Sequence, residues 1–573
     1  MSQYSQGLRF SRKSDGTYAV VGSGSCEDLE LRIPPTTPEG GRVTEIAEDA
    51  FHGQADEFFT DEGFCFLSVI IPDGVTSIGN SAFMGCTSLL SVTIPDSVTE
   101  IGEYAFSDCS SLTSIHIPEG MTEIRENTFG GCCGLTSITL PNSLKNIGFE
   151  AFSDCTCLTS LVIPDGVTSI EKHAFENCTH LTSISLPNSL ISMGNGAFAG
   201  CTSLTSVTIP RGVSTIGEPG QFGHSGYRVF SGCSGLTSME VDAENPTYYS
   251  QNNCVIERKT KRLIMGLATS RIPEDVISIG DYAFEGCVGL TAADIPHGVT
   301  EIGHRAFFEC ADLTSVTIPN SVTHIGDQAF FECKSLTSVT IPDSVTSLGV
   351  SAFYYCSALA SVILSSRITT IGQNTFAHCE SLTSISIPDG VTTIGRESFE
   401  NCAGLTSISL PDSITAIDDH AFALCKSLTS LTLPSGIKEI GENAFFGCSG
   451  LTSVTIPDSV TTMRPGAFWY CTGLRSVSLP SGMTDIGTAT FHSCTNLTTV
   501  RVPNNVKSIH RLAFLGCTGL TTVIIPAGVT SMGDWVFKNC SNLTIYCEHP
   551  ARPAKWDEDW NASDCPVVWS YKN

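Results

Sequence analysis

Leu89-Leu-Ser-Val-Thr-Ile-Pro-Asp-Ser-Val-Thr-Glu-Ile-Gly-Glu-Tyr-Ala-Phe-Ser-Asp-Cys109 is one unit of a repeat that returns every 23 residues. The next unit begins at Leu112-Thr-Ser-Ile-His-Ile-Pro118 and runs to Cys132. The apolar residues of one unit are too few and too scattered to bury each other, so identical units must stack. A fixed period of this length predicts a solenoid.

Each unit is expected to contain two short strands and a tight helical corner. In the first strand, Leu, Val and Ile alternate with Ser and Thr, so one face points inward and the other outward. Proline ends this strand because it cannot donate to a ladder, and Asp or Asn with Gly or Ser turns the chain. Val-Thr-x-Ile forms the second strand, and Gly opens the Ala-Phe-x-x-Cys corner. The fold class is therefore an α/β solenoid with parallel strand ladders and short helical corners.

The phenylalanines of the corner mark about 20 turns between Phe51 and Phe537. The register breaks at a few places, and strand-like or tryptophan-rich segments lie at the ends. The expected organisation is a β cap at 1–40, a first arm at 41–241 with insertions at 55–63 and 218–228, a β-hairpin insertion at 242–272, a second arm at 273–547 and a Trp-rich cap at 548–573.

Composition excludes several classes of protein. The 573 residues have a formal net charge of −28, with acidic residues spread along the units, which argues against nucleic acid as a partner. The basic cluster is small and comprises Arg258, Lys259, Lys261 and Arg262. The sequence has no apolar run long enough to span a membrane and no recognisable signal peptide at its start.

Nineteen of the 26 cysteines occupy one column of the repeat, from Cys86 to Cys540. A column presents thiols in a line, whereas a zinc site needs four converging ligands. We expect these cysteines to be free, buried apolar residues, with disulfides between adjacent turns or a metal role as the alternatives.

The units resemble the leucine-rich repeat pattern L-x-x-L-x-L-x-x-N/C, and more narrowly the BspA-like class of surface leucine-rich repeats. The matching phrases are Leu-Thr-Ser-Val-Thr-Ile-Pro-Asp-Ser-Val-Thr, at 451–461, and Ile-Gly-x-x-Ala-Phe-x-x-Cys, which recurs along residues 40–547. The resemblance implies a horseshoe or arc-shaped solenoid that binds proteins, typically as a surface adhesin or antigen recognising host or matrix proteins. It implies a location at the cell surface or outside the cell, whereas the missing signal peptide leaves the cytoplasm as the alternative.

The sequence predicts no enzyme, cofactor or metal site. The histidines are scattered over different turns without a fixed nucleophile beside them, so we interpret them as solvated corner residues. The aspartates that follow the strand prolines suit Asx turns better than calcium ligation, because Asn, Ser and Ala replace them at 142, 435 and 527. Outward-facing Ser and Thr suit an exposed parallel ladder, with ice or glycan binding as the alternative.

Aromatic residues vary the corner just after the repeated phenylalanine. Because the corner recurs once per turn, Phe308, Phe331 and Tyr354 should form a contiguous aromatic surface flanked by carboxylates. The alternative is that these rings pack between adjacent corners as part of the core. The candidate protein-binding residues are Phe308, Phe331, Tyr354, Tyr355, Phe446, Trp469, Tyr470, Arg258, Lys259, Lys261 and Arg262.

The sequence as a whole favours a non-enzymatic, monomeric protein that binds other proteins in adhesion or surface recognition. An intracellular interaction scaffold of the same shape is the alternative, because so many thiols are apparently unpaired.

Overall fold

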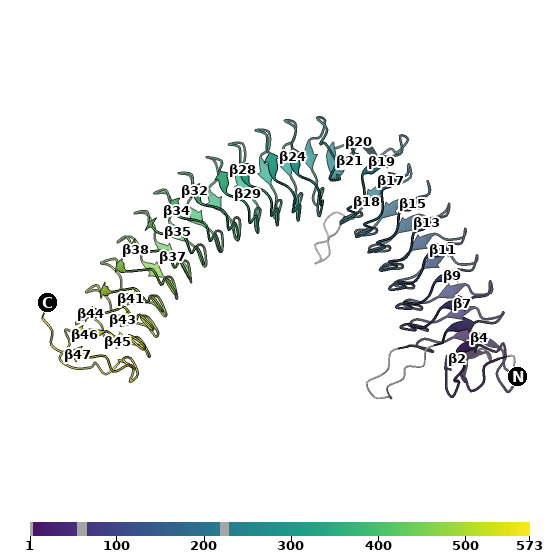
Figure 1. The fold of residues 1–573 in the computed structure, drawn as a ribbon, viewed down its shortest axis with the longest axis horizontal. Helices are drawn as coiled ribbons and strands as arrows, with labels where there is room; N and C mark the ends of the chain where they lie inside the picture. The colour runs from purple at the N-terminus through teal and green to yellow at the C-terminus, as the bar shows by residue number, and fades with distance from the viewer. Residues whose placement is uncertain (1–3, 54–65, 218–227, 573) are drawn as a thin grey trace. The chain divides into compact units, whose positions relative to one another are not determined.

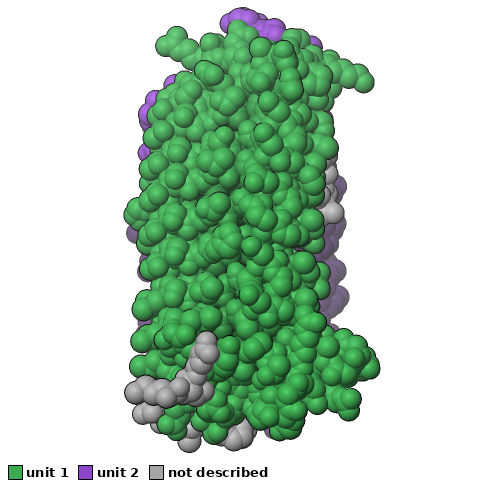
Figure 2. Space-filling view, turned by 90° about the vertical axis from the view of Figure 1, so that its right-hand side faces the viewer, with its two compact units in different colours: residues 1–271, 285–288 green, residues 272–284, 289–573 purple. Residues whose placement is uncertain are grey.

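The computed structural model describes residues 4–53, 66–217 and 228–572. These residues form two compact units, coloured separately in Figure 2. Unit 1 comprises residues 1–271 and 285–288, and unit 2 comprises residues 272–284 and 289–573. Both units are stacks of turns, in which successive strands follow one another as rungs (Figure 1). The repeats form about 23 turns, against the 20 counted from phenylalanines, because turns such as the one with Trp560 lack that phenylalanine.

The first strand of each turn contributes to one ladder, in which hydrogen-bonded neighbours are parallel and pair equivalent residues of adjacent repeats, as in Ser315↔Ser338. The pairing is interrupted at some turns, so the ladder is divided into several sheets. In unit 1 this ladder contains β3 (Glu30–Arg32), β5 (Ser68–Ile70), β7 (Ser91–Thr93), β9 (Ser114–His116), β11 (Ser137–Thr139), β13 (Ser160–Val162), β15 (Ser183–Ser185), β17 (Ser206–Ile209) and β19 (Ser238–Val241). In unit 2 it contains β24 (Ala292–Asp294), β26 (Ser315–Thr317), β28 (Ser338–Thr340), β30 (Ser361–Ile363), β32 (Ser384–Ser386), β34 (Ser407–Ser409), β36 (Leu431–Thr432), β38 (Ser453–Thr455), β40 (Ser476–Ser478), β42 (Thr499–Arg501), β44 (Thr522–Ile525), β46 (Thr544–Cys547) and β47 (Val567–Val568).

The second strand of each turn is shorter and contributes to another ladder. In unit 1 it contains β2 (Tyr18–Gly22), β4 (Val43–Ile46), β6 (Ser77–Ile78), β8 (Glu100–Ile101), β10 (Glu123–Ile124), β12 (Asn146–Ile147), β14 (Ser169–Ile170), β16 (Ser192–Met193) and β18 (Thr215–Ile216). In unit 2 it contains β23 (Ser278–Ile279), β25 (Glu301–Ile302), β27 (His324–Ile325), β29 (Ser347–Leu348), β31 (Thr370–Ile371), β33 (Thr393–Ile394), β35 (Ala416–Ile417), β37 (Glu439–Ile440), β39 (Thr462–Met463), β41 (Asp485–Ile486), β43 (Ser508–Ile509) and β45 (Ser531–Met532).

The corners contain no helix in the described ranges, so the expectation of helical corners was wrong. The backbone N–H groups of Arg305, Phe307 and Glu309 donate to the carbonyls of Asp327, Ala329 and Phe331 in the next turn, at 2.8–2.9 Å. A helix would instead direct each N–H to the carbonyl four residues earlier. Two residues of this corner, Arg305 and Glu309, have left-handed backbones with φ of 51° and 56°, which interrupts any helix. The corner is therefore a third line of hydrogen bonds between turns.

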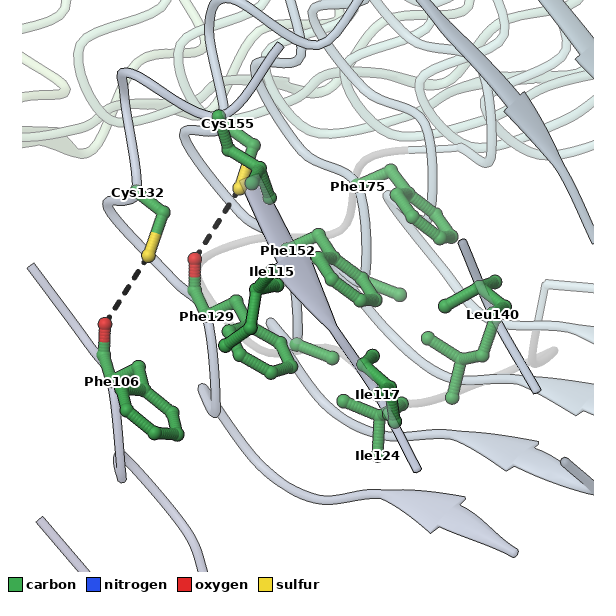
Figure 3. Packing of buried hydrophobic residues seen from close by; sticks show 14 of the residues in the cluster. Phe106, Ile115, Ile117, Ile124, Phe129, Cys132, Leu140, Phe152, Cys155 and Phe175 are labelled. Carbon is green, nitrogen blue, oxygen red and sulfur yellow. Dashed lines mark hydrogen bonds between the residues drawn. The ribbon is translucent and has the colours of Figure 1, made fainter. Parts of the chain in front are cut away.

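The phenylalanine that predicted the period forms the centre of each stack. Phe106, Phe129, Phe152 and Phe175 lie on successive turns, and their ring centroids are 5.3–5.7 Å apart in stacked geometry (Figure 3). All four side chains are fully buried. Each turn thus covers the aromatic ring of its neighbour, which no turn can do alone.

The cysteine column hydrogen-bonds the same phenylalanines. The thiol of Cys132 donates to the carbonyl of Phe106 at 3.2 Å, and that of Cys155 donates to the carbonyl of Phe129 at 3.3 Å (Figure 3). The pattern repeats in unit 2, where Cys333 donates to Phe307. All cysteines of the described residues are free. The thiol therefore supplies a donor for a buried carbonyl, a role that a purely apolar side chain would leave unfilled.

Burial should make these thiols unreactive in the folded protein. It raises the pKa of Cys402 to about 12 and that of Cys333 well above its usual range, so the thiolate that attacks a disulfide reagent is scarce. With Ellman's reagent at pH 8, we expect fast reaction of the half-buried Cys133 and Cys157. Cys287 is also half-buried but should react slowly, because burial raises its pKa to about 12. After unfolding in guanidinium without reductant, all 26 cysteines should react.

Fast labelling of the column in the native protein would contradict this packing. Fewer than 26 thiols in the unfolded protein would instead indicate disulfides.

The ends of the solenoid are closed in different ways. At the N-terminal end, β1 (Arg9–Arg12) pairs antiparallel with β2, which then pairs parallel with β4. At the C-terminal end, Trp560 takes the place of the repeated phenylalanine and its ring lies 6.0 Å from that of Phe537. Cys565 lies two residues beyond the next position of the cysteine column, and its thiol donates to the carbonyl of Cys540. The two caps therefore cover the end turns by different contacts from those between repeats.

Unit 1 ends in an antiparallel group of three strands, β20 (Tyr248–Gln251), β21 (Cys254–Glu257) and β22 (Arg262–Met265). The sequence predicted two strands here, around the basic turn. The third strand, β20, contains the Tyr-Tyr pair of the preceding segment. The insertions expected at 55–63 and 218–228 lie outside the described residues, except for Arg228.

None of the described residues forms a helix long and apolar enough to cross a membrane.

Candidate functional site

The position after the repeated phenylalanine, here called the shoulder position, differs between the two units. In unit 1 its occupants are mostly small or polar: His52, Met84, Ser107, Gly130, Ser153, Glu176, Ala199, Ser231 and Glu285. In unit 2 five turns have an aromatic ring there: Phe308, Phe331, Tyr354, Phe446 and Trp469. The corner backbone is the same in both units, so the fold does not require aromatic residues at this position. They form two groups.

The first group, called the aromatic ladder, comprises Phe308, Phe331, Tyr354, Tyr355 and His378. The rings of Phe308 and Phe331 stack at 4.8 Å, and those of Phe331 and Tyr354 stack at 4.9 Å. All three side chains are half-buried, so one edge of each stacked ring faces solvent. The ladder is thus both an extension of the packing and an accessible surface.

Tyr355 and His378 widen the ladder at the next position of the corner. Tyr355 is 36% exposed and lies edge-on to Tyr354 at 4.9 Å. The imidazole of His378 stacks on the Tyr355 ring at 4.1 Å, and Asn401 Nδ2 lies 3.2 Å from its Nδ1. From its sequence position His378 is expected to be solvated, whereas the structure places it against the most exposed ring of the ladder.

Carboxylates border the ladder, as expected. Burial and the neighbouring Glu332 raise the pKa of Glu309, and burial and Glu397 raise the pKa of Glu400. Burial, then Tyr355 and nearby glutamates including Glu400, raise the pKa of Tyr354. The rings therefore lie in a region of negative potential.

The second group, called the Trp469 cluster, comprises Phe446, Trp469, Tyr470 and His492. The Phe446 and Trp469 rings meet edge-on at 5.4 Å, and the Trp469 and His492 rings meet edge-on at 5.2 Å. Tyr470 is 47% exposed. Ala377, Glu400 and Ala423 occupy the shoulder positions between the two groups, so they are separate surfaces of unit 2.

The left-handed position after the shoulder also separates the units. Unit 1 fills it with Gly, Asp or Asn, the residues that tolerate positive φ, as at Asp108, Asp154 and Asn177. In unit 2 four turns keep Asn or Gly there, at Asn401, Gly447, Gly516 and Asn539. The other turns hold Glu309, Glu332, Tyr355, His378, Leu424, Tyr470 and Ser493, all at φ between 56° and 61°. A backbone held in this region by an ordinary side chain is strained, and strain of this kind gathers at functional sites. Comparison of the two halves of the sequence contained this signal.

Relief of the strain should stabilise unit 2. Glu309→Asn places at φ 56° a residue that unit 1 uses at the same position, and it removes a carboxylate whose charged form burial disfavours. We expect the free energy of unfolding to rise by about 1 kcal/mol, measured by guanidinium denaturation followed by circular dichroism. The reciprocal change, Gly516→Ala at φ 71°, should lower it by about the same amount. If both variants have the same free energy of unfolding as the unmodified chain, this position is unstrained.

The repeats match the family model described as the BspA type leucine rich repeat region in six overlapping copies, at 55–178, 122–243, 224–310, 256–380, 300–429 and 415–544. The chain belongs to the BspA-type leucine-rich repeat family. The resemblance inferred from the sequence is thereby confirmed.

Solved structures of several leucine-rich repeat proteins are similar to this BspA-type chain. A leucine rich cell surface protein from Faecalibacterium prausnitzii is 28% identical, with a TM-score of 0.39 over 83% of this chain and 95% of that chain. The T. pallidum leucine rich repeat protein is 31% identical, with a TM-score of 0.31 over 35% of this chain and 88% of that chain. The pneumococcal vaccine antigen PcpA is 18% identical, with a TM-score of 0.41 over 79% and 93%. Comparison with curated protein sequences gives no match.

The basic turn of this BspA-type protein binds its own strands. Arg258 Nε donates to the carbonyl of Asn245 at 2.9 Å, and Lys261 Nζ donates to the hydroxyl of Tyr249 at 3.2 Å. Both cations also lie over the Tyr249 ring, at 5.4 and 4.6 Å from its centroid. Lys259 is exposed and Arg262 is half-buried. Two of the four predicted basic residues therefore fasten the turn to β20. The sequence did not predict this contact, because it indicated only two strands within 242–272 and did not place Tyr249 beneath the turn.

The BspA-type repeats give less support for a metal site or a small-molecule site. Across residues 4–53, 66–217 and 228–572, no three His, Cys, Asp or Glu side chains converge as metal ligands would. A pocket of about 330 Å³ lies between the turns of β39 and β41, lined mainly by threonines, Met463, Met483 and Asp485. Asp485 and His510 are 3.8 Å apart at its rim, and both are half exposed.

Proposed function

We propose that this protein is a non-enzymatic adhesion protein that recognises other proteins through the aromatic corners of unit 2. Leucine-rich repeat solenoids of this family are typically protein-binding surface proteins. The observation that carries the proposal is the shoulder position, which is aromatic in five turns of unit 2 although unit 1 builds the same corner with residues such as Ser107 and Gly130. Residues that the fold does not need are available for recognition.

The ladder has the composition of a protein-binding surface. Tyr and Trp are enriched at the residues that contribute most to protein interfaces, because they offer a large apolar area with few rotatable bonds and a polar end. Stacking between turns holds these rings in place before a partner arrives, which lowers the entropy lost on binding.

A second candidate is an intracellular interaction scaffold. The thiols favour it, because no disulfide joins cysteines of the described residues and disulfides are typical of exported proteins. The thiol measurement described above bears on this alternative, since disulfides in protein isolated without reductant would exclude it.

The proposal is tested by solid-phase binding to purified collagen, fibronectin and laminin. A ladder variant, Phe308→Ala/Phe331→Ala/Tyr354→Ala, should bind the recognised protein at least about tenfold more weakly than the unmodified chain. The matched control changes three adjacent turns, two of them shared with the ladder variant, on the exposed face of the first strand, as Thr317→Ala/Thr340→Ala/Ser361→Ala, and should bind normally.

Circular dichroism and the unfolding midpoint show whether both triple variants are folded. Equal binding by the two variants would reject the aromatic ladder as the recognition surface. Failure of the unmodified chain to bind any of the three proteins would reject matrix adhesion.

A further inference from the structure

The aromatic ladder combines rings with negative charge, and the Trp469 cluster does not. In the turns from Phe307 to Phe399 the two positions after the phenylalanine hold Glu309, Glu332 and Glu400 beside the rings. In the turns from Phe422 to Phe514 the same two positions hold no carboxylate. Unit 2 thus contains two aromatic surfaces with similar rings and different electrostatics.

A guanidinium already occupies one end of the ladder. The Arg305 guanidinium lies 4.6 Å from the centroid of the Phe308 ring, and its Nε donates to Gln328 Oε1 at 2.5 Å. A cation over an aromatic face is attracted by the ring quadrupole, most strongly where water is excluded. The unit itself therefore shows that one ring of the ladder, Phe308, accepts an arginine side chain on its face.

The local cations do not neutralise the carboxylates. Lys334 bridges Glu332 at 2.9 Å and Arg396 bridges Glu397 at 3.0 Å. Nevertheless the pKa of Glu309 stays raised, because burial and Glu332 outweigh Lys334 and Arg305. The pKa of Glu400 is raised in the same way by burial and Glu397. An added cation at this surface would relieve the repulsion.

We propose that the aromatic ladder of unit 2 binds arginine side chains from a basic segment of a protein partner. The inference rests on the proposed function and names the chemistry of the partner. Tyr354 stacks on Phe331 and His378 covers one face of Tyr355, so the exposed part of the Tyr355 ring is the contact offered to a guanidinium. Glu309 and Glu400 supply acceptors for its N–H groups. The net charge of −28 attracts such a segment over distances longer than the contact itself.

Arginine fits this surface better than lysine. A guanidinium is planar and weakly hydrated, so it stacks on a ring while its N–H groups bond carboxylates in the same plane. An ammonium is strongly hydrated and makes no such planar contact. The ladder should therefore distinguish two peptides of equal charge.

The test measures fluorescence anisotropy of labelled octa-arginine, octa-lysine and octa-glutamate titrated with the full chain. We expect octa-arginine to bind more tightly than octa-lysine, and octa-glutamate not to bind. The variant Tyr354→Leu/Tyr355→Leu should weaken octa-arginine binding about five- to tenfold. Leucine is compatible with the left-handed position, since Leu424 occupies it in a later turn at φ 61°.

Two further variants separate this site from the general charge of the chain. Glu309→Gln/Glu400→Gln removes two charges that burial already disfavours, so it should fold normally and weaken octa-arginine binding. The matched control Tyr470→Leu changes an exposed tyrosine at the same left-handed position of the carboxylate-free Trp469 cluster, and should leave binding unchanged. Equal affinities of the Tyr354→Leu/Tyr355→Leu variant and the unmodified chain would overturn the proposal, as would equal losses in Tyr470→Leu.

The two proposals fail in different ways. In one outcome the Phe308, Phe331 and Tyr354 alanine variant no longer binds the matrix protein, but the Tyr354→Leu/Tyr355→Leu variant binds octa-arginine normally. The ladder then recognises proteins by contacts other than arginine binding. If the ladder variants change neither matrix-protein binding nor octa-arginine binding, both proposals are rejected.

Discussion

Phe330→Ala is expected to lower the free energy of unfolding by about 3–5 kcal/mol. The Phe330 side chain is fully buried, and its ring stacks on those of Phe307 and Phe353, each at 5.2 Å. Its carbonyl also accepts a hydrogen bond from the thiol of Cys356, at 3.1 Å. Removing the ring leaves a cavity bounded by two rigid neighbouring turns that cannot close over it. Guanidinium unfolding followed by circular dichroism measures the loss.

The neighbouring residue provides the control. Phe331 is half-buried in the aromatic ladder, so Phe331→Ala removes stacking with Phe308 and Tyr354 without opening a cavity in the core. We expect a loss of about 1 kcal/mol from this change. Equal losses at the two positions would mean that the ladder is core packing and would remove the distinction on which the proposed surface depends.

Gly349→Ala is expected to cost about 3 kcal/mol, because overpacking here meets backbone and not a flexible side chain. A Cβ atom at Gly349 would lie 2.3 Å from the amide nitrogen of Asp327 and 2.3 Å from the carbonyl carbon of Gly326. Relief would require adjacent turns to move apart, which would lengthen the hydrogen bonds between them. Thermal unfolding, compared with the unmodified chain, measures the effect.

Gly482→Ala tests whether the close approach causes the loss. No atom lies within 4 Å of a Cβ placed at Gly482, and its φ is not positive. This substitution should change the free energy of unfolding by less than about 1 kcal/mol, with a gain expected from the less flexible unfolded chain. A large loss at Gly482, or none at Gly349, would contradict the spacing of the turns.

The sequence predicted the strands and the core well, because both depend on periodicity. Phe330 and Cys333 recur every 23 residues, and a residue that recurs in a stack meets its own copies. The corner was predicted wrongly as a helix, since Ala-Phe-x-x-Cys contains no residue that forbids one. The structure instead depends on the left-handed backbones of residues such as Arg305 and Glu309. Arginine and glutamate do not favour this conformation, so the sequence did not predict it.

The candidate surface was predicted in part. The spacing of Phe308, Phe331 and Tyr354 gave their order along the stack, but not the guanidinium of Arg305 or the imidazole of His378, which reach the rings from neighbouring positions. The basic turn shows a different limit of prediction from the sequence. Arg258 and Lys261 looked like a free positive patch because nothing in the spacing indicated that Tyr249 lies beneath them.

The hydrogen bond from each cysteine to the phenylalanine carbonyl of the turn before it has a consequence for how such a protein can evolve. Within the regular runs from Cys86 to Cys233 and from Cys310 to Cys540 each joint has this same bond, so a duplication or deletion of whole 23-residue units there leaves each remaining joint intact. The C-terminal cap contacts only the end of the second run, through Trp560 against Phe537 and Cys565 against Cys540, so it is compatible with any number of units before it. The number of repeats can therefore change during evolution without loss of folding. Selection can then act on the corner side chains one repeat at a time.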